Sequence, residues 1–404
     1  MNNRITNSML VSNFMNDLYN NMNKLSKLQS QMASGKKYAH ISDDPVAVIF
    51  SQQARYKLAR LEHYQLNVDA AESRLTQVET GLMELNNVLI SAYESVIDAR
   101  TGVKSDSDRV NIAMYMGQLR DHILQTLNTT YGDKFIYGGY NTTGYTDTGK
   151  AVPPFTVNDA GNLCYNGVDL TQTDAKTLAL IDRLRQDVLT FDLGIGTEMP
   201  VSVNGIDLVF YGREPVMDQV FESDGVTPVL DADGNPVYAQ RMQQVTDIYG
   251  AAQFESDGVT PIMEPVFANL NIYNLVSRLY DALNGDPVSD IAGTVTEYHG
   301  TEGTRVVADM DIYEYLEVSI TQLQRAQNHV LAITADIGGR TKRIEILKSR
   351  YEQDNINYLQ MLSDAEDMDI AEVIMNYKMA ETVYRAALAS GASIIQPTLM
   401  DFLR

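Results

Sequence analysis

The sequence predicts a mainly α-helical protein with a β-rich insert. Both chain ends build one long antiparallel helical rod, and a central mixed α/β domain is inserted between its halves. The first observation is proline placement, because nine of the eleven prolines lie between Pro153 and Pro287. Proline removes a helical hydrogen bond and clashes with the preceding turn, so long helices are expected in the flanking proline-free stretches. The other two observations are apolar residues spaced by three and four in those stretches, and alternating ones between them.

The two proline-free stretches each predict a long helix. From Leu58 to Val96 the apolar spacing indicates a helix over about residues 46–100, which would be ~80 Å long at 1.5 Å per residue. Asp44 can cap its start, because Pro45 then takes the first helical position, where its missing N–H costs nothing. In the last third of the chain, the same spacing from Val306 to Tyr351 predicts the partner helix.

A third helix is predicted after residue 102. Ser105 and Asp108 form a capping-box pattern, which indicates a helix that continues to about Thr130. Together these helices predict a helical rod domain over residues 45–140 and 300–364.

Residues 141–299 predict a β-rich variable insert domain. Asn204-Gly205 lies between alternating apolar residues, which is the strongest short-range hairpin signal. Two weaker hairpins are predicted from Phe155 to Tyr165 and from Val229 to Tyr238.

The insert also contains a short internal repeat. Phe221–Pro228 and Phe254–Pro261 have the same eight residues. Two copies are too few for a solenoid, so the repeat predicts a duplicated hairpin edge. Helices are expected to interrupt the insert at about residues 173–189 and 270–283.

The two chain ends carry a stricter pattern, with steps of four and three over residues 11–32 and 373–394. This spacing is typical of coiled-coil seams, here about three heptads each. It predicts terminal coiled-coil arms over residues 1–44 and 365–404, which form an assembly domain. The positions assigned to the assembly interface are Val11, Met15, Leu18, Met22, Leu25, Met32, Val373, Tyr377, Ala380, Tyr384, Ala387 and Ile394.

The flanks of the N-terminal seam are uncharged. The first 34 residues hold four charged side chains beside eight asparagines, whereas a solvated coiled coil places Glu and Lys beside its seam. Two interpretations follow. The arms pair with each other and finish an ordinary bundle, or they pair only on assembly, inside a tube of identical or related subunits. In the second case free arms would be largely disordered, because an isolated helix is marginal in water.

Composition excludes several functional classes. The formal net charge of −22 repels phosphate backbones and anionic lipids, so neither nucleic-acid binding nor membrane insertion is expected. Cys164 is the single cysteine, which rules out an intramolecular disulfide. Residues 1–13 lack the basic and apolar regions of a cleavable signal peptide, so export would use another route.

No catalytic, cofactor or metal site is predicted, and we expect no enzyme. The five histidines show no metal-ligand spacing. The sequence from Asp231 begins like a calcium-binding loop, but its sixth position is Pro236, where such a loop needs glycine. The acidic residues 364–369 could bind a cation, but a solvated break between two heptad phases explains them more simply.

Short motifs occur at both ends of the chain, around an insert without a family signature. They are Arg4–Leu10, Gln31–Lys37, Ser42–Ala47, Phe135–Tyr140, Ala365–Asp369, Leu388–Gln396 and Pro397–Leu403. In this order they resemble the flagellin superfamily. The Asp401-Phe402-Leu403 ending resembles subunits of the hook–filament junction more than filament flagellin.

The resemblance implies a structural adaptor that joins the flagellar hook to the filament by coiled-coil packing of its arms. It implies partners among the other axial proteins (hook-associated proteins and flagellin), self-association in a ring, and an export chaperone on the C-terminal region. The expected location is the extracellular bacterial flagellum, reached without a cleavable signal peptide. The alternatives are filament flagellin, or a surface adhesin or binding module that acts through residues 141–299.

Overall fold

The computed structural model describes residues 7–38, 40–101, 105–147, 150–220, 229–230, 237–244, 260–286, 296–299, 303–306 and 311–400. The chain divides into two compact units. The terminal unit comprises Met1–Leu66 and Leu347–Arg404, and the central unit comprises Asn67–Ile346.

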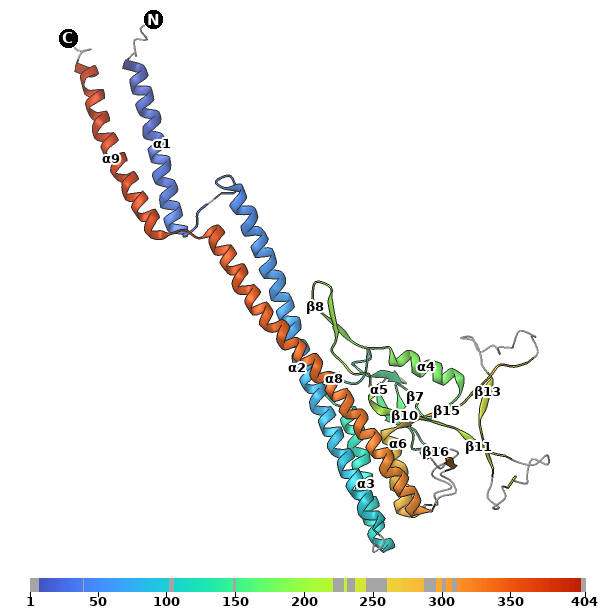
Figure 1. The fold of residues 1–404 in the computed structure, drawn as a ribbon. Coiled ribbons are helices and arrows are strands. Elements are labelled where there is room, and N and C mark those ends of the chain that lie inside the picture. Colours follow the sequence, from blue (N-terminus) through green and yellow to red (C-terminus); the bar gives the residue numbers. More distant parts are fainter. Residues whose placement is uncertain are drawn as a thin grey trace. The chain divides into compact units, whose positions relative to one another are not determined.

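Five long helices contain more than half of the described residues (Figure 1). The sequence predicts the starts of α2 and α3, whereas the predicted start of α8 is wrong, because Val306 lies in β17 (Gly303–Val306) and α8 begins at Ile312. Pro45 is the first residue of α2, and Asp44 Oδ1 accepts hydrogen bonds from the amides of Val46 and Ala47 at 3.1 and 3.0 Å. Ser105 and Asp108 form the predicted capping box of α3. The long helices are α1 (Asn7–Ser34), α2 (Pro45–Arg100), α3 (Asp106–Leu127), α8 (Ile312–Glu366) and α9 (Ile370–Met400).

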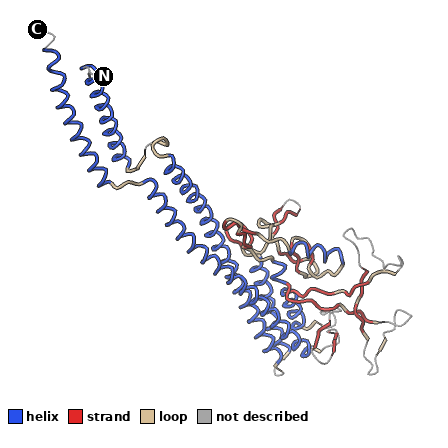
Figure 2. Tube along the Cα trace, turned by 45° about the horizontal axis from the view of Figure 1, so that its top comes forward, coloured by secondary structure: helices blue, strands red, loops and turns tan. Residues whose placement is uncertain are grey.

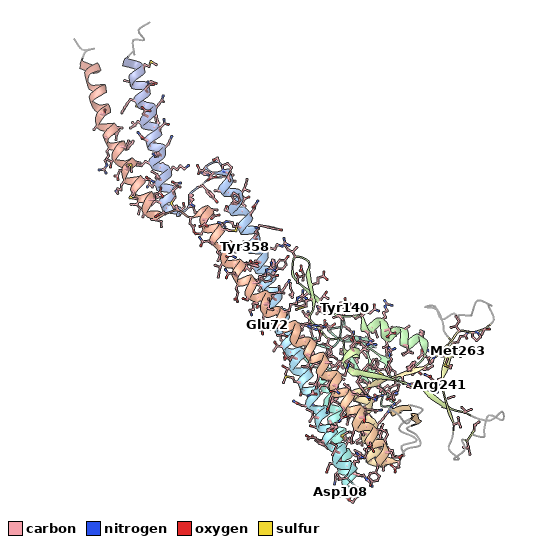
Figure 3. The ribbon with its side chains drawn as sticks, in the orientation of Figure 1. Glu72, Asp108, Tyr140, Arg241, Met263 and Tyr358 are labelled. Carbon is pink, nitrogen blue, oxygen red and sulfur yellow. The ribbon has the colours of Figure 1, made fainter. Side chains whose placement is uncertain are left out.

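In the terminal unit, α1 lies beside α9, and the start of α2 lies beside the end of α8 (Figure 2). Aromatic contacts join the second pair. The rings of Tyr64 and Tyr351 stack with centroids 6.1 Å apart, and the Lys57 ammonium lies 5.3 Å from the ring centroid of Tyr358, which is labelled in Figure 3.

The central unit holds most of the buried apolar residues. The apolar residues of the predicted helical spacing are nearly all buried on α2, from Val68 to Val96, and on α8, from Leu316 to Ile344. Helix α6 (Ile272–Asn284) packs against α3. Its start is capped by Asn271, whose side chain accepts from the amide of Asn274.

The strands of the insert are short and pair antiparallel within the described residues, in sheets of two or three strands. The helices between them are α4 (Ala175–Arg185) and α5 (Gly205–Val209). The strand pairs are β1 (Thr130–Tyr131) with β2 (Lys134–Phe135), β3 (Tyr145–Asp147) with β4 (Lys150–Val152), β5 (Phe155–Val157) with β6 (Leu163–Tyr165) and β7 (Val168–Asp169), β8 (Thr190–Gly194) with β9 (Thr197–Pro200), β10 (Phe210–Pro215) with β15 (Phe267–Asn271), β11 (Met217–Gln219) with β12 (Tyr238–Gln240), β13 (Met242–Gln244) with β14 (Met263–Pro265), and β16 (Thr296–His299) with β17 (Gly303–Val306).

The hairpin predicted at Asn204-Gly205 is wrong. Asn204 instead caps the start of α5, where its Oδ1 accepts from the Ile206 amide at 2.9 Å. Gly205 lies against Tyr137, whose carbonyl accepts from the Gly205 amide at 3.1 Å, and a Cβ there would overlap the Phe155 ring. Asn and Gly suit helix starts as well as tight turns, and the tertiary contact selects the helix.

The other predictions for the insert have different outcomes. The Phe155–Tyr165 hairpin is confirmed as β5 and β6, and the two predicted helices are confirmed as α4 and α6. The turn at residues 233–236 and nearly all of the duplicated segment, at 221–228 and 254–261, lie outside the described residues.

Candidate assembly interface

Helices α1 and α9 run antiparallel, with coiled-coil-like spacing on their facing sides. Half-buried positions recur at steps of three and four on α1, and half-buried or buried positions do so on α9. On α1 the side chains are Val11, Phe14, Leu18, Asn21, Leu25, Leu28 and Gln31, and on α9 they are Val373, Tyr377, Ala380, Tyr384, Ala387 and Gly391.

The contact between Phe14 and Gly391 fixes the register of this pair. Gly391 is buried, and a Cβ at this position would overlap the Phe14 ring. Glycine therefore permits a close approach that a larger residue would prevent. At the other end of the pair, the Met368 amide donates to the Gly35 carbonyl at 3.2 Å.

The predicted interface positions fall into two groups. Those on α9 lie on the side that faces α1, although the side chain of Ile394 is outside the description. On α1, Val11, Leu18 and Leu25 face α9, whereas Met15, Met22 and Met32 are exposed. Phe14, Asn21 and Gln31, which each precede one of these three methionines by one residue, are half-buried in their place, because the helix turns that side toward α9.

The exposed apolar residues follow stripes beside the α1–α9 contact. On α1, Met15, Tyr19 and Met22 are spaced by four and three, and Met22 is 47% exposed. On α9, Met375, Met379 and Val383 are spaced by four. We call these two sets the outer stripes. Because the intrachain pair leaves them uncovered, they are available to another molecule.

The terminal unit exposes more large apolar side chains than the number of apolar residues it buries. Among the described residues, it exposes twenty large apolar side chains and buries five apolar residues. Monomeric soluble proteins rarely expose large apolar patches unless they are binding surfaces. The five buried residues are Val48, Ala54, Leu61, Tyr351 and Val373.

An ionic cluster with a buried carboxylate lies where α8 ends, and we call Lys36, Arg55 and Glu366 the joint cluster. Arg55 Nε and Nη2 donate to the two carboxylate oxygens of Glu366 at 2.9 and 2.6 Å. Lys36 Nζ donates to Glu366 Oε2 at 2.8 Å. The hydrogen bonds from Arg55 and Lys36 lower the pKa of Glu366 to about 2.

Sequence reasoning missed this cluster. Residues 364–369 were interpreted as a solvated break, and the break is real because α8 ends at Glu366 and α9 begins at Ile370. Glu366 itself is only 5% exposed. A lone buried carboxylate needs paired cations, but those cations lie more than 300 residues away, so no local pattern could indicate them.

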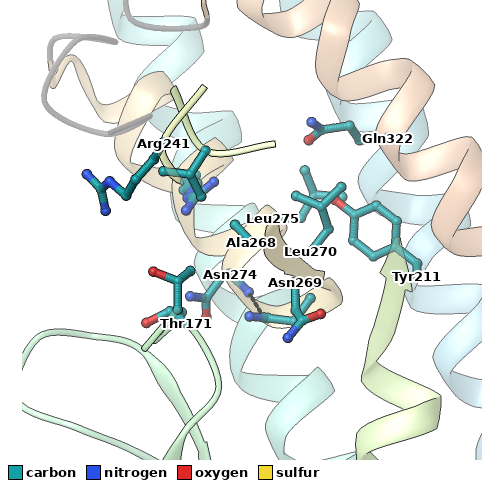
Figure 4. A pocket seen from close by; sticks show the side chains of 13 residues that line it. Thr171, Tyr211, Arg241, Ala268, Asn269, Leu270, Asn274, Leu275 and Gln322 are labelled. Carbon is teal, nitrogen blue, oxygen red and sulfur yellow. Dashed lines mark hydrogen bonds between the residues drawn. The ribbon is translucent and has the colours of Figure 1, made fainter. Parts of the chain in front are cut away.

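The central unit contains a polar cavity of about 200 Å³ (Figure 4). Its lining includes Tyr211, Arg241, Asn274, Arg278 and Gln322. The lining has no nucleophile paired with a base, which an acyl- or group-transfer site would need. In the described part of the chain, no group of three or more His, Cys, Asp or Glu could hold a metal ion.

Glu214 is the other buried carboxylate with a strongly altered pKa. It lies on β10, is 3% exposed, and has its nearest described cation in Arg325, at 3.7 Å from Oε1. Burial raises its pKa to about 7, against the opposing charges of Arg325 and Arg278.

The comparisons with known proteins agree with the terminal motifs. A family model described as the bacterial flagellin N-terminal helical region matches residues 5–142. Flagellar hook-associated protein 3 of Salmonella typhimurium is 33% identical over 148 residues, which cover 34% of this chain and 44% of that protein. The Escherichia coli protein of the same name is 23% identical over 393 residues, which cover 95% and 94% of the two chains.

The fold is also similar to a solved structure attributed to a flagellar hook-associated protein of Vibrio parahaemolyticus. The TM-score is 0.50 at 14% identity, and the match covers 80% of this chain and 100% of the other. The likeness shows a shared fold of long helices, and the N-terminal part of that fold, residues 5–142, matches the bacterial flagellin N-terminal helical region. The resemblance to the flagellin superfamily is confirmed, and over nearly its whole length the chain is similar to flagellar hook-associated protein 3. No helix in the described residues is both long and apolar enough to cross a membrane.

Proposed function

We propose that the chain is a structural adaptor subunit of the bacterial flagellum. It joins the hook to the filament by packing its terminal helices against neighbouring axial subunits. Support comes from the flagellin-type N-terminal region and from the similarity to two proteins named flagellar hook-associated protein 3. The role is structural, with no catalysis and no cofactor.

The observation that carries the proposal is the pair of outer stripes. The α1–α9 contact is satisfied within one chain, yet Met22 on α1 and Met379 on α9 remain exposed. Methionine adapts its shape to irregular partner surfaces. A helix that has already paired and still presents an apolar stripe is suited to pack against further helices.

The proposal assigns roles to the predicted domains. Residues 1–44 and 365–404 form the assembly domain, residues 45–140 and 300–364 the helical rod, and residues 141–299 the variable insert. The partners are other axial proteins and further copies in a ring, with an export chaperone on the C-terminal region. The mature subunit is extracellular, on the flagellum, and is exported without a cleavable signal peptide.

Two substitutions three residues apart test the proposal. Met22→Asp places a charge on the outer stripe, where it stays hydrated in the monomer. Leu25→Asp places the charge in the α1–α9 contact, where an unpaired buried carboxylate costs several kcal/mol. Each variant is produced in a deletion strain, where motility and attached filaments are scored by electron microscopy.

We expect Met22→Asp to keep wild-type amide protection along α1 and to lose attached filaments. Leu25→Asp should lose both the amide protection along α1 and the attached filaments. The matched control is Asn20→Asp, at an exposed polar position on α1, which should behave as wild type. Normal filaments on Met22→Asp cells would overturn the assignment of the outer stripe to assembly.

Two alternatives make different predictions. Filament flagellin is favoured by the same N-terminal family match, but it would be far more abundant than a single ring of junction subunits. Quantifying the protein per flagellum separates the two. An adhesin that acts through residues 141–299 predicts that cells lacking the insert keep their filaments and lose surface binding.

A further inference from the structure

We propose that Lys36, Arg55 and Glu366 are positioning residues, which hold the α1–α9 pair in one orientation to the start of α2 and the end of α8. All these segments belong to the terminal unit. The inference rests on the proposed function in one respect: a fixed orientation matters because it presents the outer stripes to neighbouring subunits.

The joint between the two helix pairs is crossed by two short irregular connections. Residues 35–44 link α1 to α2, and residues 367–369 link α8 to α9. Such segments at helix ends are where hinges form, because a few backbone dihedrals absorb the rotation. Two covalent connections by themselves therefore do not set the angle.

The joint cluster ties three separate segments to one carboxylate. Glu366 is the last residue of α8, Arg55 lies in the third turn of α2, and Lys36 lies in the linker just after α1. The guanidinium of Arg55 binds both carboxylate oxygens, a fork geometry that restricts direction as well as distance. The Glu366 side chain is 7% exposed, and those of Arg55 and Lys36 are 53% and 42% exposed. The carboxylate is therefore the fixed point of the cluster.

Other polar contacts also bind the linker after α1 to α8 and α2. The Lys37 amide donates to the Glu366 carbonyl at 2.7 Å, and Lys37 Nζ donates to the Asp364 carbonyl at 2.5 Å. Tyr38 Oη donates to Ser51 Oγ at 2.7 Å. The linker that follows α1 is thus bound to both α8 and α2 by polar contacts.

Apolar packing does not replace these contacts at the joint. Ile41, Val46, Ile49 and Phe50 are all more than half exposed, and so is Ile370 at the start of α9. Val48 and Ala54 on the same turns of α2 are buried, but the five more exposed side chains add little packing, so the orientation depends mainly on the hydrogen-bonded ion pairs. Removing the Glu366 charge should release the joint without unfolding either helix pair.

The test measures the joint in the full-length monomer. Spin labels are placed on exposed positions of α9 and α8, at Ala386→Cys and Glu352→Cys, in a Cys164→Ser background. Double electron–electron resonance then gives the distribution of distances between the labels. We compare wild type, Glu366→Gln, and the charge-inverted triple variant K36E/R55E/E366R. The matched control is Glu381→Gln, which removes a half-buried carboxylate on α9 that is also ion-paired, to Lys378 and Arg385.

We expect one narrow distance peak for wild type and Glu381→Gln, loss of that peak in Glu366→Gln, and its return in the inverted variant. Thermal unfolding and amide exchange along α1 report whether each variant is folded. A narrow wild-type peak in Glu366→Gln would overturn the proposal. A broad distribution in both Glu366→Gln and a folded inverted variant would also overturn it, because the orientation would not depend on complementary charge.

Filament attachment in the deletion strain separates this inference from the proposed function. We expect fewer attached filaments with Glu366→Gln and recovery with the inverted variant. Normal attachment with Glu366→Gln, despite a released joint, would overturn the positioning role and leave the adaptor function standing. If the wild-type gene itself failed to restore filaments, the proposed function would be wrong, while the distance measurements would still decide whether the cluster holds the joint.

Discussion

Arg55 and Glu366 are separated by 311 residues of chain, and their side chains meet in a two-point ion pair at 2.9 and 2.6 Å. The pair joins the third turn of α2 to the last residue of α8. Lys36, in the linker just after α1, donates to the same carboxylate, so the joint cluster links three segments that the sequence predicts separately.

The first prediction concerns acid stability. The folded-state pKa of Glu366 is lowered to about 2, from an ordinary value of 4.5. A lowered pKa means that the carboxylate stabilises the fold fully above pH 4.5 and loses this effect as the pH falls towards 2. The difference corresponds to about 3 kcal/mol. Urea unfolding should show Glu366→Gln less stable than wild type at neutral pH and equally stable near pH 2. A constant difference in unfolding free energy between the variant and wild type across this pH range would contradict this prediction.

The second prediction concerns Glu214, where the sign is opposite. Its folded-state pKa is raised to about 7 because burial disfavours the charged form. Stability from this group is therefore fully present below pH 4.5 and is lost as the pH rises through 7. Glu214→Gln should be more stable than wild type at pH 8, by about 3 kcal/mol, and should match it near pH 4. Denaturant titrations at the two pH values test this, and a destabilised Gln variant at pH 8 would refute it.

The third prediction uses the close contact of Gly391 with Phe14. Gly391→Val should overpack this contact and cost about 1–3 kcal/mol, seen as loss of amide protection along α1. Ala389→Val is the control, because residue 389 is exposed on the same helix and also becomes β-branched, and helix propensity by itself would favour Gly391→Val over it. Equal protection in both variants would show that α1 and α9 are not paired through Phe14.

The fourth prediction compares two helical glycines. A Cβ at Gly81 would lie 2.5 Å from Tyr137 Oη, which donates to the Val78 carbonyl at 3.1 Å. Gly81→Ala should displace this buried tyrosine and lower the melting temperature of the central unit, despite the better helix propensity of alanine. Gly338 on α8 has no atom near its Cβ position. Gly338→Ala should therefore stabilise by up to about 1 kcal/mol. If both variants melted alike, the Tyr137 contact would contribute little.

The long helices could be predicted from sequence because their signals are local. Caps at Asp44 and Ser105, and apolar residues every three or four positions, lie within one or two turns of the residues they organise. The same is true of the break between α8 and α9, where the heptad phase changes. These features predict where helices begin and end, whereas the class of protein was predicted from the motifs at the two chain ends, which resemble the flagellin superfamily.

The tertiary structure alone decided which residues meet. The spacing of three and four residues fits a seam that contains Phe14 as well as one that contains Met15. The sequence does not distinguish these two seams, and the contact of α9 with one side of α1 selects the one with Phe14. Asn204 suits a turn and a helix start equally, and the contact of Gly205 with Tyr137 selects the helix. Glu366 is indistinguishable from its solvated neighbours until the fold brings Lys36 and Arg55 to it. Local spacing determines secondary structure, but burial and ion pairing depend on segments far apart in the chain.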